Sequence, residues 1–338
     1  MTPADLLGAA ILVALVLYAV LGGADFGGGV WDLLASGPRR REQRALVERA
    51  IAPVWEANHV WLILVIVVLF TGFPAAFAEI SIALFVPLVL LLVGIVLRGA
   101  AFTFRTYDRA DDRVQARWGL VFSMSSVLAP LALGTVVGAL ASGRLRVAAR
   151  GSEPLAWLAP FPLSVGLFAV ALFAYVAAAY LAVEAEGALR EDFRRRAAAA
   201  GVAVFLCAGL AGALSRAEAP LVFAGLTARA WSLPLHLGTG AAAIAAFAAL
   251  RAGRVRTARA AAVAQTALVV LGWGASQYPY VVVPDLTLAS ASAPRATQVA
   301  LLWALGAGAV LLFPALYALF RVFKGERPFA VVDRRAPR

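Results

Sequence analysis

Long apolar stretches without a single Asp, Glu, Lys or Arg recur along the whole chain. They number nine and cover residues 6–24, 60–78, 80–97, 119–141, 155–183, 197–215, 230–250, 260–284 and 296–320. A helix needs about 20 apolar residues to cross the hydrocarbon core of a bilayer, and each window is close to that length. In the overlong fifth window, we expect the membrane part to be 161–183. Because the windows lack the two-residue alternation of a membrane barrel, the pattern predicts nine transmembrane helices.

The basic residues are distributed unevenly over the connections between these windows. If alternate connections lie on opposite sides, 24 of the 30 Lys and Arg residues fall on the side of the C-terminal tail. Cytoplasmic loops carry the excess of positive charge, so this split predicts an external N-terminus and a cytoplasmic C-terminus. No linker or short repeat divides the chain. We therefore expect residues 1–338 to form a single polytopic, all-α membrane domain made of helical bundles.

The composition agrees with a membrane protein and excludes several other classes. Hydrophobic residues make up 62% of the chain and charged residues 14%, whereas soluble proteins average about 45–50% and about 25%. A soluble enzyme is therefore excluded. The net charge of +11 would suggest a nucleic-acid partner in a soluble chain. Here the excess lies on the predicted cytoplasmic side, where it meets anionic lipid, so we expect no nucleic acid to bind.

Few residues in this chain can bind a metal or a haem. The single cysteine, Cys207, excludes an intrachain disulfide framework and a thiolate-rich metal site. The two histidines, His59 and His236, fall near opposite faces of the predicted bilayer, so they cannot ligate the same iron. Met124 is too weak a candidate to complete a haem site with His59. We expect no metal site and no haem on this chain alone.

Polar residues gather where three predicted helices end on the cytoplasmic side. Asp25 follows the first window in a glycine-rich run, a polar segment precedes the second window, and Arg98 follows the third. The whole group comprises Asp25, Trp55, Glu56, Asn58, His59 and Arg98. Carboxylates at the edge of an apolar bundle can exchange protons, but acids at helix ends also serve as simple caps. Both interpretations of Asp25 and Glu56 stay open from the residues alone.

A secondary transporter or permease is the alternative function for such a chain. Transporters place ionisable groups or broken helices near the middle of the membrane. None of the nine windows contains an acid or a base, and this argues against a transporter.

Several motifs carry a resemblance to a known family. They are residues 22–27 (GGADFG), 51–62 (IAPVWEANHVWL), 70–74 (FTGFP), 97–102 (LRGAAF) and 277–280 (QYPY). The second motif is long and specific. With these motifs the chain resembles, essentially from end to end, subunit II of the cytochrome bd-type quinol oxidases. The likeness is greatest to the branch often called cyanide-insensitive oxidases.

This resemblance implies a function and a partner. Bd-type oxidases of the bacterial plasma membrane oxidise quinol from the quinone pool and reduce oxygen to water with cytoplasmic protons. Subunit I carries haem d, two b-type haems and the quinol site. Subunit II is then expected to bind no haem, to have no catalytic activity alone, and to stabilise subunit I. A small accessory subunit is left open.

The resemblance also implies roles for the polar group near the cytoplasmic side. Asp25, Glu56, Asn58 and His59 are expected to form a cytoplasmic proton path. Arg98, with Trp55 beside it, is expected to pair with an acid of the group or with a haem propionate of subunit I.

Two positions depart from the family pattern. Gly22 stands where the family has a first Asp, and Thr103 stands where an acid often precedes the final Phe-Arg of the third-helix motif. A proton route in this chain must therefore run differently at these two points, or through water.

Overall fold

The computed structural model describes residues 1–51, 55–107, 112–146 and 155–324, and for residues 51, 55–57, 106, 107, 112, 113, 320 and 322–324 it describes the backbone alone. The described chain is almost entirely helical. Its helices are α1 (Pro3–Leu17), the π-helical turn η1 (Tyr18–Gly22), α2 (Gly23–Leu33), α3 (Arg40–Ile51), α4 (Trp55–Gly72), α5 (Pro74–Ala83), α6 (Phe85–Tyr107), α7 (Asp112–Ala141), the 3-10 turn η3 (Ala156–Leu158), α8 (Pro160–Glu184), α9 (Gly187–Glu218), α10 (Pro220–Ala228), α11 (Ser232–Arg251), α12 (Val255–Gln277) and α13 (Arg295–Lys324). A short antiparallel hairpin of β1 (Tyr280–Val282) and β2 (Leu286–Thr287) pairs Tyr280 with Thr287.

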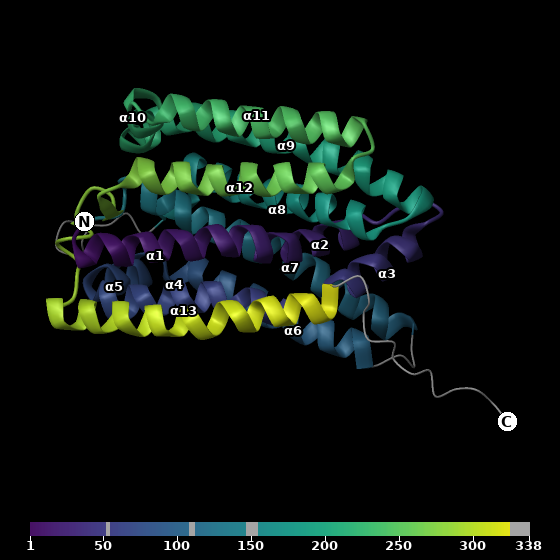
Figure 1. The fold of residues 1–338 in the computed structure, drawn as a ribbon, viewed down its shortest axis with the longest axis horizontal. Helices are drawn as coiled ribbons and strands as arrows, with labels where there is room; N and C mark the ends of the chain where they lie inside the picture. The colour runs from purple at the N-terminus through teal and green to yellow at the C-terminus, as the bar shows by residue number, and fades with distance from the viewer. Residues whose placement is uncertain (52–54, 108–111, 147–154, 325–338) are drawn as a thin grey trace.

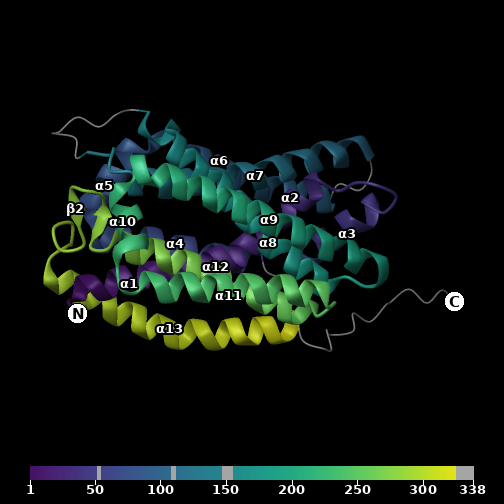
Figure 2. The ribbon, with the colours of Figure 1, turned by 90° about the horizontal axis from the view of Figure 1, so that it is seen from above.

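The long helices lie side by side along one axis of the molecule (Figure 1, Figure 2). One group contains α1 with α2, α4, α6 and α7, and a second group contains α8, α9, α11 and α12. Helices α2 and α7 pack against α8 and so join the groups, while α13 lies outside against α1 and α4. We call the end of the bundle that carries α3 the α3 end. The N-terminus, α5, α10 and the hairpin lie at the opposite end (Figure 1, Figure 2).

The helices of the described chain are those of a multi-pass membrane protein. Eight are long and apolar enough to cross a bilayer, or nine if the bent pair α4–α5 counts as one span. This confirms the all-α membrane class that the apolar windows predict. The long helices run between the two ends of the bundle, as expected if alternate connections lie on opposite sides of the membrane. Which end faces the cytoplasm stays a prediction.

The first membrane helix is longer than its apolar window. Helices α1, η1 and α2 form a continuous run of 31 residues, Pro3–Leu33, whereas the window ends at residue 24. Asp25 therefore lies inside a helix rather than after one. The window ends there because it stops at the first charge, and the helix continues because that charge is paired in the interior.

Glycines in α2 allow its neighbours to approach unusually closely. A Cβ atom on Gly27 would lie 2.0 Å from the carbonyl oxygen of Phe173 in α8, and one on Gly29 would lie 2.1 Å from Oγ of Ser126 in α7. Glycine costs a helix interior about 1 kcal/mol relative to alanine. In α2 this cost is offset because two helices pack directly on its backbone. The glycine-rich run is therefore a packing surface.

The second and third apolar windows, 60–78 and 80–97, are divided differently in the structure. Helix α4 ends at Gly72, and α5 continues at an angle of 117°. Pro74 causes this break because it has no N–H group and disfavours helical geometry at the preceding residue, and Phe73 has a φ of −137°. The 10 residues of α5 are too few to cross a bilayer. They lie across the end of the bundle, and α6 begins at Phe85.

We expect Gly27→Ala to destabilise the protein, because the new methyl group overlaps the backbone of α8. Overpacking of this kind costs about 1–3 kcal/mol. The matched control is Gly209→Ala in α9, where no atom lies within 4 Å, and where alanine stabilises a helix by about 0.5–1 kcal/mol. The midpoint of thermal unfolding of the purified protein measures both effects. Equal midpoints for the two variants would contradict the close contact of α2 with α8.

Candidate functional site

Asp25 on α2 and Arg98 on α6 form a buried ion pair. Nη2 of Arg98 donates to Oδ1 of Asp25 at 2.6 Å, and only 3% of Asp25 and 1% of Arg98 are exposed. Nε of Arg98 also donates to Oγ of Ser126 on α7 at 3.0 Å. The rings of Phe26 and Phe122 lie 4.9 and 5.0 Å from the guanidinium carbon. The arginine of α6 is thus held by polar groups and aromatic faces of two other helices, α2 and α7.

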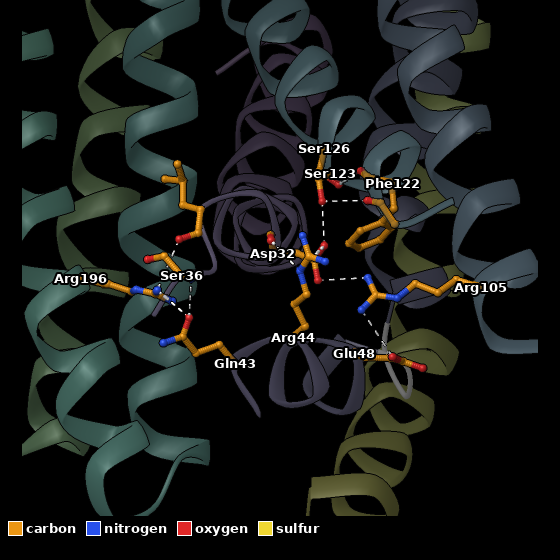
Figure 3. Close-up of polar contacts among 12 residues, drawn as sticks. Asp32, Ser36, Gln43, Arg44, Glu48, Arg105, Phe122, Ser123, Ser126 and Arg196 are labelled. Atoms are coloured by element: carbon orange, nitrogen blue, oxygen red, sulfur yellow. Dashed lines mark hydrogen bonds and ion pairs between the residues drawn. The ribbon is translucent and has the colours of Figure 1, made fainter. Parts of the chain in front are cut away.

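A second buried carboxylate, that of Asp32, is paired in the same way. Nη1 of Arg105 donates to Oδ1 of Asp32 at 3.0 Å, and Oγ of Ser123 donates to Oδ2 at 2.8 Å (Figure 3). Asp32 is fully buried. Nε of Arg44 on α3 donates to its backbone carbonyl at 3.3 Å, and Glu48 of α3 lies 3.7 Å from Nη2 of Arg105 (Figure 3). Asp32 therefore connects α2, α6 and α7 with α3.

The two ion pairs are repeats of one arrangement. Seven residues separate Asp25 from Asp32, and seven separate Arg98 from Arg105. Seven residues are about two helical turns, so both acids lie on one face of α2 and both arginines on one face of α6. We call Asp25–Arg98 the inner rung and Asp32–Arg105, nearer to α3, the outer rung. The sequence prediction did not include the outer rung, although the shared spacing of acid and arginine is a signal that could have found it.

Helix α3 closes this end of the bundle through polar contacts with α9. Nε of Arg39 donates to Asp192 at 2.8 Å, and Gln43 donates to the same carboxylate at 3.1 Å. Arg196 donates to Gln43 at 2.8 Å, as Figure 3 shows, and its guanidinium lies over the ring of Trp31. The hydrogen bond to Asp192 raises the pKa of Arg39 above its ordinary value.

Two residues expected in the proton path, Asn58 and His59, lie in the first turns of α4. Asn58 is buried, and His59 is half-buried. The ring centroid of His59 is 5.8 Å from that of Phe26 and 6.2 Å from that of Tyr18. Since Phe26 is the neighbour of Asp25 and covers Arg98, the structure brings His59 to the inner rung.

The other two expected residues of this segment cannot be placed in the same way. Trp55 and Glu56 belong to α4 by their backbone, and their side chains lie outside the described part of the structure.

One carboxylate oxygen of Asp25 has no hydrogen-bond partner among the described residues. Among the described residues, neither Oδ2 of Asp25 nor the hydroxyl of Tyr18 has a hydrogen-bond partner, and both atoms are buried. A buried polar atom without a partner costs about 1–3 kcal/mol. A water molecule that donates a hydrogen bond to Oδ2 would relieve that cost.

Gly22 and Thr103, the two positions that depart from the family pattern, have different surroundings in the structure. A Cβ atom on Gly22 would lie 3.0 Å from the ring of Tyr18, so the tyrosine ring takes up the space that a larger side chain needs. Thr103 is exposed, and its hydroxyl donates to the carbonyl of Gly99 in its own helix. Neither position contributes a second acid to the inner rung.

The side chains that the structure describes do not form a haem site. His59 lies at the start of α4 at the α3 end, whereas His236 lies at the start of α11 at the opposite end, with Nδ1 2.7 Å from the carbonyl oxygen of Ser232. Met124 points outward and is 55% exposed. Within the described ranges, no three His, Cys, Asp or Glu side chains could hold a metal ion together.

Comparison with known families identifies the class of protein to which this bundle belongs. The family model for cytochrome bd terminal oxidase subunit II matches residues 4–323. The chain therefore belongs to the family of cytochrome bd terminal oxidase subunit II, and the resemblance seen in the motifs is confirmed.

Individual relatives agree with this family. The chain is similar to the cytochrome bd-I ubiquinol oxidase subunit 2 of Escherichia coli K12, at 28% identity over 59% of this chain and 54% of the relative. This match thus spans about half the length of that relative. A putative cytochrome bd menaquinol oxidase subunit II of Bacillus subtilis is 24% identical over 93% of each chain.

The fold is that of a solved bd oxidase. A chain of the bd oxidase from Geobacillus thermodenitrificans superposes with a TM-score of 0.81, covering 96% of this chain and 99% of that one at 24% identity. This likeness establishes the fold alone.

We expect Arg98→Ala to destabilise the protein strongly, because it leaves the Asp25 charge buried without a counter-charge. Breaking one side of a buried pair costs about 3–5 kcal/mol. Arg98→Lys keeps the charge but loses the planar group that reaches both Asp25 and Ser126, so we expect a smaller loss. The yield of folded protein and its unfolding midpoint measure both, with the exposed Arg41→Ala of α3 as the control. Wild-type yield and midpoint in both Arg98 variants would show that the inner rung is dispensable.

Proposed function

We propose that the chain is the haem-free subunit II of a bd-type quinol oxidase, a complex that oxidises quinol and reduces oxygen to water. In this proposal the chain spans the bacterial plasma membrane with its N-terminus outside. It stabilises a haem-bearing subunit I and has no catalytic activity alone. Haem d, two b-type haems and the quinol site belong to the partner. Membership of the subunit II family and the poor fit of this chain's own side chains to a haem support this assignment.

The exposed apolar surface supports a role in assembly. Helix α13 has none of its span residues buried, and large side chains such as Phe70 of α4 and Leu92 of α6 are also exposed. Surfaces of this kind are covered in the membrane by lipid or by another subunit. Subunit I is the partner that the family provides.

The second part of the proposal is a proton path that enters at the α3 end. Oxygen reduction consumes protons deep in a medium of low dielectric constant, so titratable groups and water must deliver them. Glu56, Asn58, His59 and Asp25 would form this path. The observation that carries it is the inner rung: Arg98 holds Asp25 in place through Oδ1, while the buried Oδ2 stays without a partner in the described residues.

His59 supports the same path by its position. Its ring forms a three-membered cluster with those of Tyr18 and Phe26, and Phe26 is the residue that follows Asp25. An imidazole can pass a proton between its two nitrogens, and the buried amide of Asn58 in the same helical turn can orient water. Protons would leave Asp25 toward subunit I.

We expect the isolated chain to bind no haem in stoichiometric amount. The reason is that its two histidines lie at opposite ends of the bundle, and that within the described residues no three His, Cys, Asp or Glu side chains gather to hold a metal ion. The chain is purified without its partner, and its haem content is measured as the pyridine haemochrome. A haem content near one per chain would contradict this expectation.

We expect Glu56→Gln to slow turnover by about 100-fold in a complex that retains its haems, because the amide keeps the shape but cannot carry a proton. Glu56→Asp should retain much of the activity. The matched control is Glu42→Gln on the exposed face of α3, which should turn over normally. Quinol-dependent oxygen consumption is compared with haem content from the reduced-minus-oxidised spectrum.

Asp25→Asn tests the second acid under a stricter condition, because it also removes the counter-charge of Arg98. It should therefore lower both assembly and turnover per haem. Normal turnover per haem in assembled Glu56→Gln and Asp25→Asn complexes would reject the path and leave the chain a structural subunit. Loss of assembly in Glu56→Gln, with normal turnover in the remaining complex, would assign Glu56 a structural role.

A further inference from the structure

A groove between α9 and α11 at the α3 end has no part in the path proposed above. It has a volume of about 330 Å³ and is lined by Arg194 and Arg195 of α9 and by Arg251 of α11, with apolar side chains beneath them. The two helices lie next to each other in the second group of the bundle (Figure 1). The groove opens on the outside of the protein.

Arg194 builds the groove rather than serving as its free charge. Its Nε donates to Glu191 at 2.6 Å, and its Nη1 donates to the carbonyl oxygens of Leu250 at 2.7 Å and Arg251 at 3.1 Å. These bonds join the first turns of α9 to the last turn of α11. They also hold the end of α11 in place at the mouth of the groove.

The other two arginines provide charge that the protein does not neutralise. Arg195 shares the carboxylate of Glu191 with Arg194, and its side chain is 78% exposed. Arg251 is exposed, and its guanidinium makes no ion pair within the described ranges. Three arginines facing one glutamate leave a local excess of two positive charges. The mouth of the groove therefore attracts an anion.

Below the arginines the walls become apolar. Ala198 and Val202 follow Arg195 at intervals of about one turn along α9, and Phe247 precedes Arg251 by one turn on α11. The charged mouth thus lies at the end of the bundle, and the apolar walls extend toward the middle of the two spans. A soluble anion would contact only the mouth.

We propose that this groove is a binding site for one anionic phospholipid. The phosphate would lie against Arg195 and Arg251, and the start of an acyl chain would lie along Val202 and Phe247. A phosphate above a hydrocarbon chain matches both the charge and the polarity of the groove. A choline headgroup matches less well, because its cation meets the same arginines. In the proposed orientation the lipid belongs to the cytoplasmic leaflet.

The test uses the haem-containing complex, purified in detergent and titrated with phosphatidylglycerol or with phosphatidylcholine of the same acyl chains. Native mass spectrometry counts the bound lipid. The double variant Arg195→Gln/Arg251→Gln should lower the affinity for phosphatidylglycerol about tenfold. The double variant Arg40→Gln/Arg41→Gln removes the same charge from exposed positions of α3 and should stay within about twofold of the wild type.

Two further arms distinguish a lipid from a free phosphate. Val202→Ser removes apolar contact without a change in charge, and it should weaken phosphatidylglycerol binding severalfold; millimolar inorganic phosphate should not displace the lipid. Equal loss of phosphatidylglycerol in both arginine double variants would overturn the site. Displacement by phosphate together with no effect of Val202→Ser would overturn the lipid in favour of a free anion. Equal affinity for phosphatidylcholine would overturn the selectivity for an anionic headgroup.

Discussion

The rest of this bundle is organised around a full charge pair inside an apolar interior. A lone buried arginine or aspartate costs several kcal/mol, so the pair persists only when geometry and additional hydrogen bonds are both favourable. Arg98 meets this condition through Asp25, Ser126 and two aromatic faces. Each of these partners comes from α2 or α7, whereas the arginine comes from α6. The pair therefore fixes the positions of α2, α6 and α7 along the bundle axis relative to one another. Apolar contacts alone do not fix these positions, because they tolerate the sliding of one helix along another. A second pair two helical turns away, Asp32 and Arg105, also fixes the direction of these helices relative to one another.

This arrangement is possible only because the backbones come close together. Asp25 and Asp32 have short side chains, so α2 must lie almost in contact with its neighbours for the carboxylates to reach α6 and α7. The glycines between the two acids provide that proximity: Gly27 contacts the backbone of α8, and Gly29 contacts Ser126, which is itself a partner of Arg98. Packing and ion pairing in α2 are thus coupled. A residue with a side chain at Gly29 would displace the serine that binds the arginine.

The sequence predicts the membrane class, the approximate number of spans and the residues of the inner rung. Long apolar runs indicate helices that cross a bilayer, and polar residues beside several of these runs indicate a shared polar site. It does not predict where the first helix ends. A search for uncharged windows places a helix end at every charge, so it cannot find Asp25 and Arg98 inside spans. Charged residues do lie inside the spans, so the family match, and not the absence of charges from the windows, distinguishes this chain from a transporter. The break at Pro74 can be predicted from the sequence, because proline interrupts helices. The contact of Arg196 with α3 cannot be predicted in this way, because it depends on how helices far apart in the sequence pack against each other.

The two rungs differ in how many carboxylate oxygens have a hydrogen-bond partner among the described residues. Both oxygens of Asp32 are engaged, one by Arg105 and one by Ser123, and α3 covers its carbonyl as well. Asp32 therefore joins α2 to α6 through one carboxylate oxygen and to α7 through the other. Asp25 has one oxygen engaged by Arg98 and one without a partner in the described residues. The Arg98 contact, which uses Oδ1, leaves Oδ2 of Asp25 available to the proposed proton path, whereas both oxygens of Asp32 are used in contacts between helices. The outer rung therefore holds α3, α6 and α7 together at the α3 end, and the proposed path would use the inner rung.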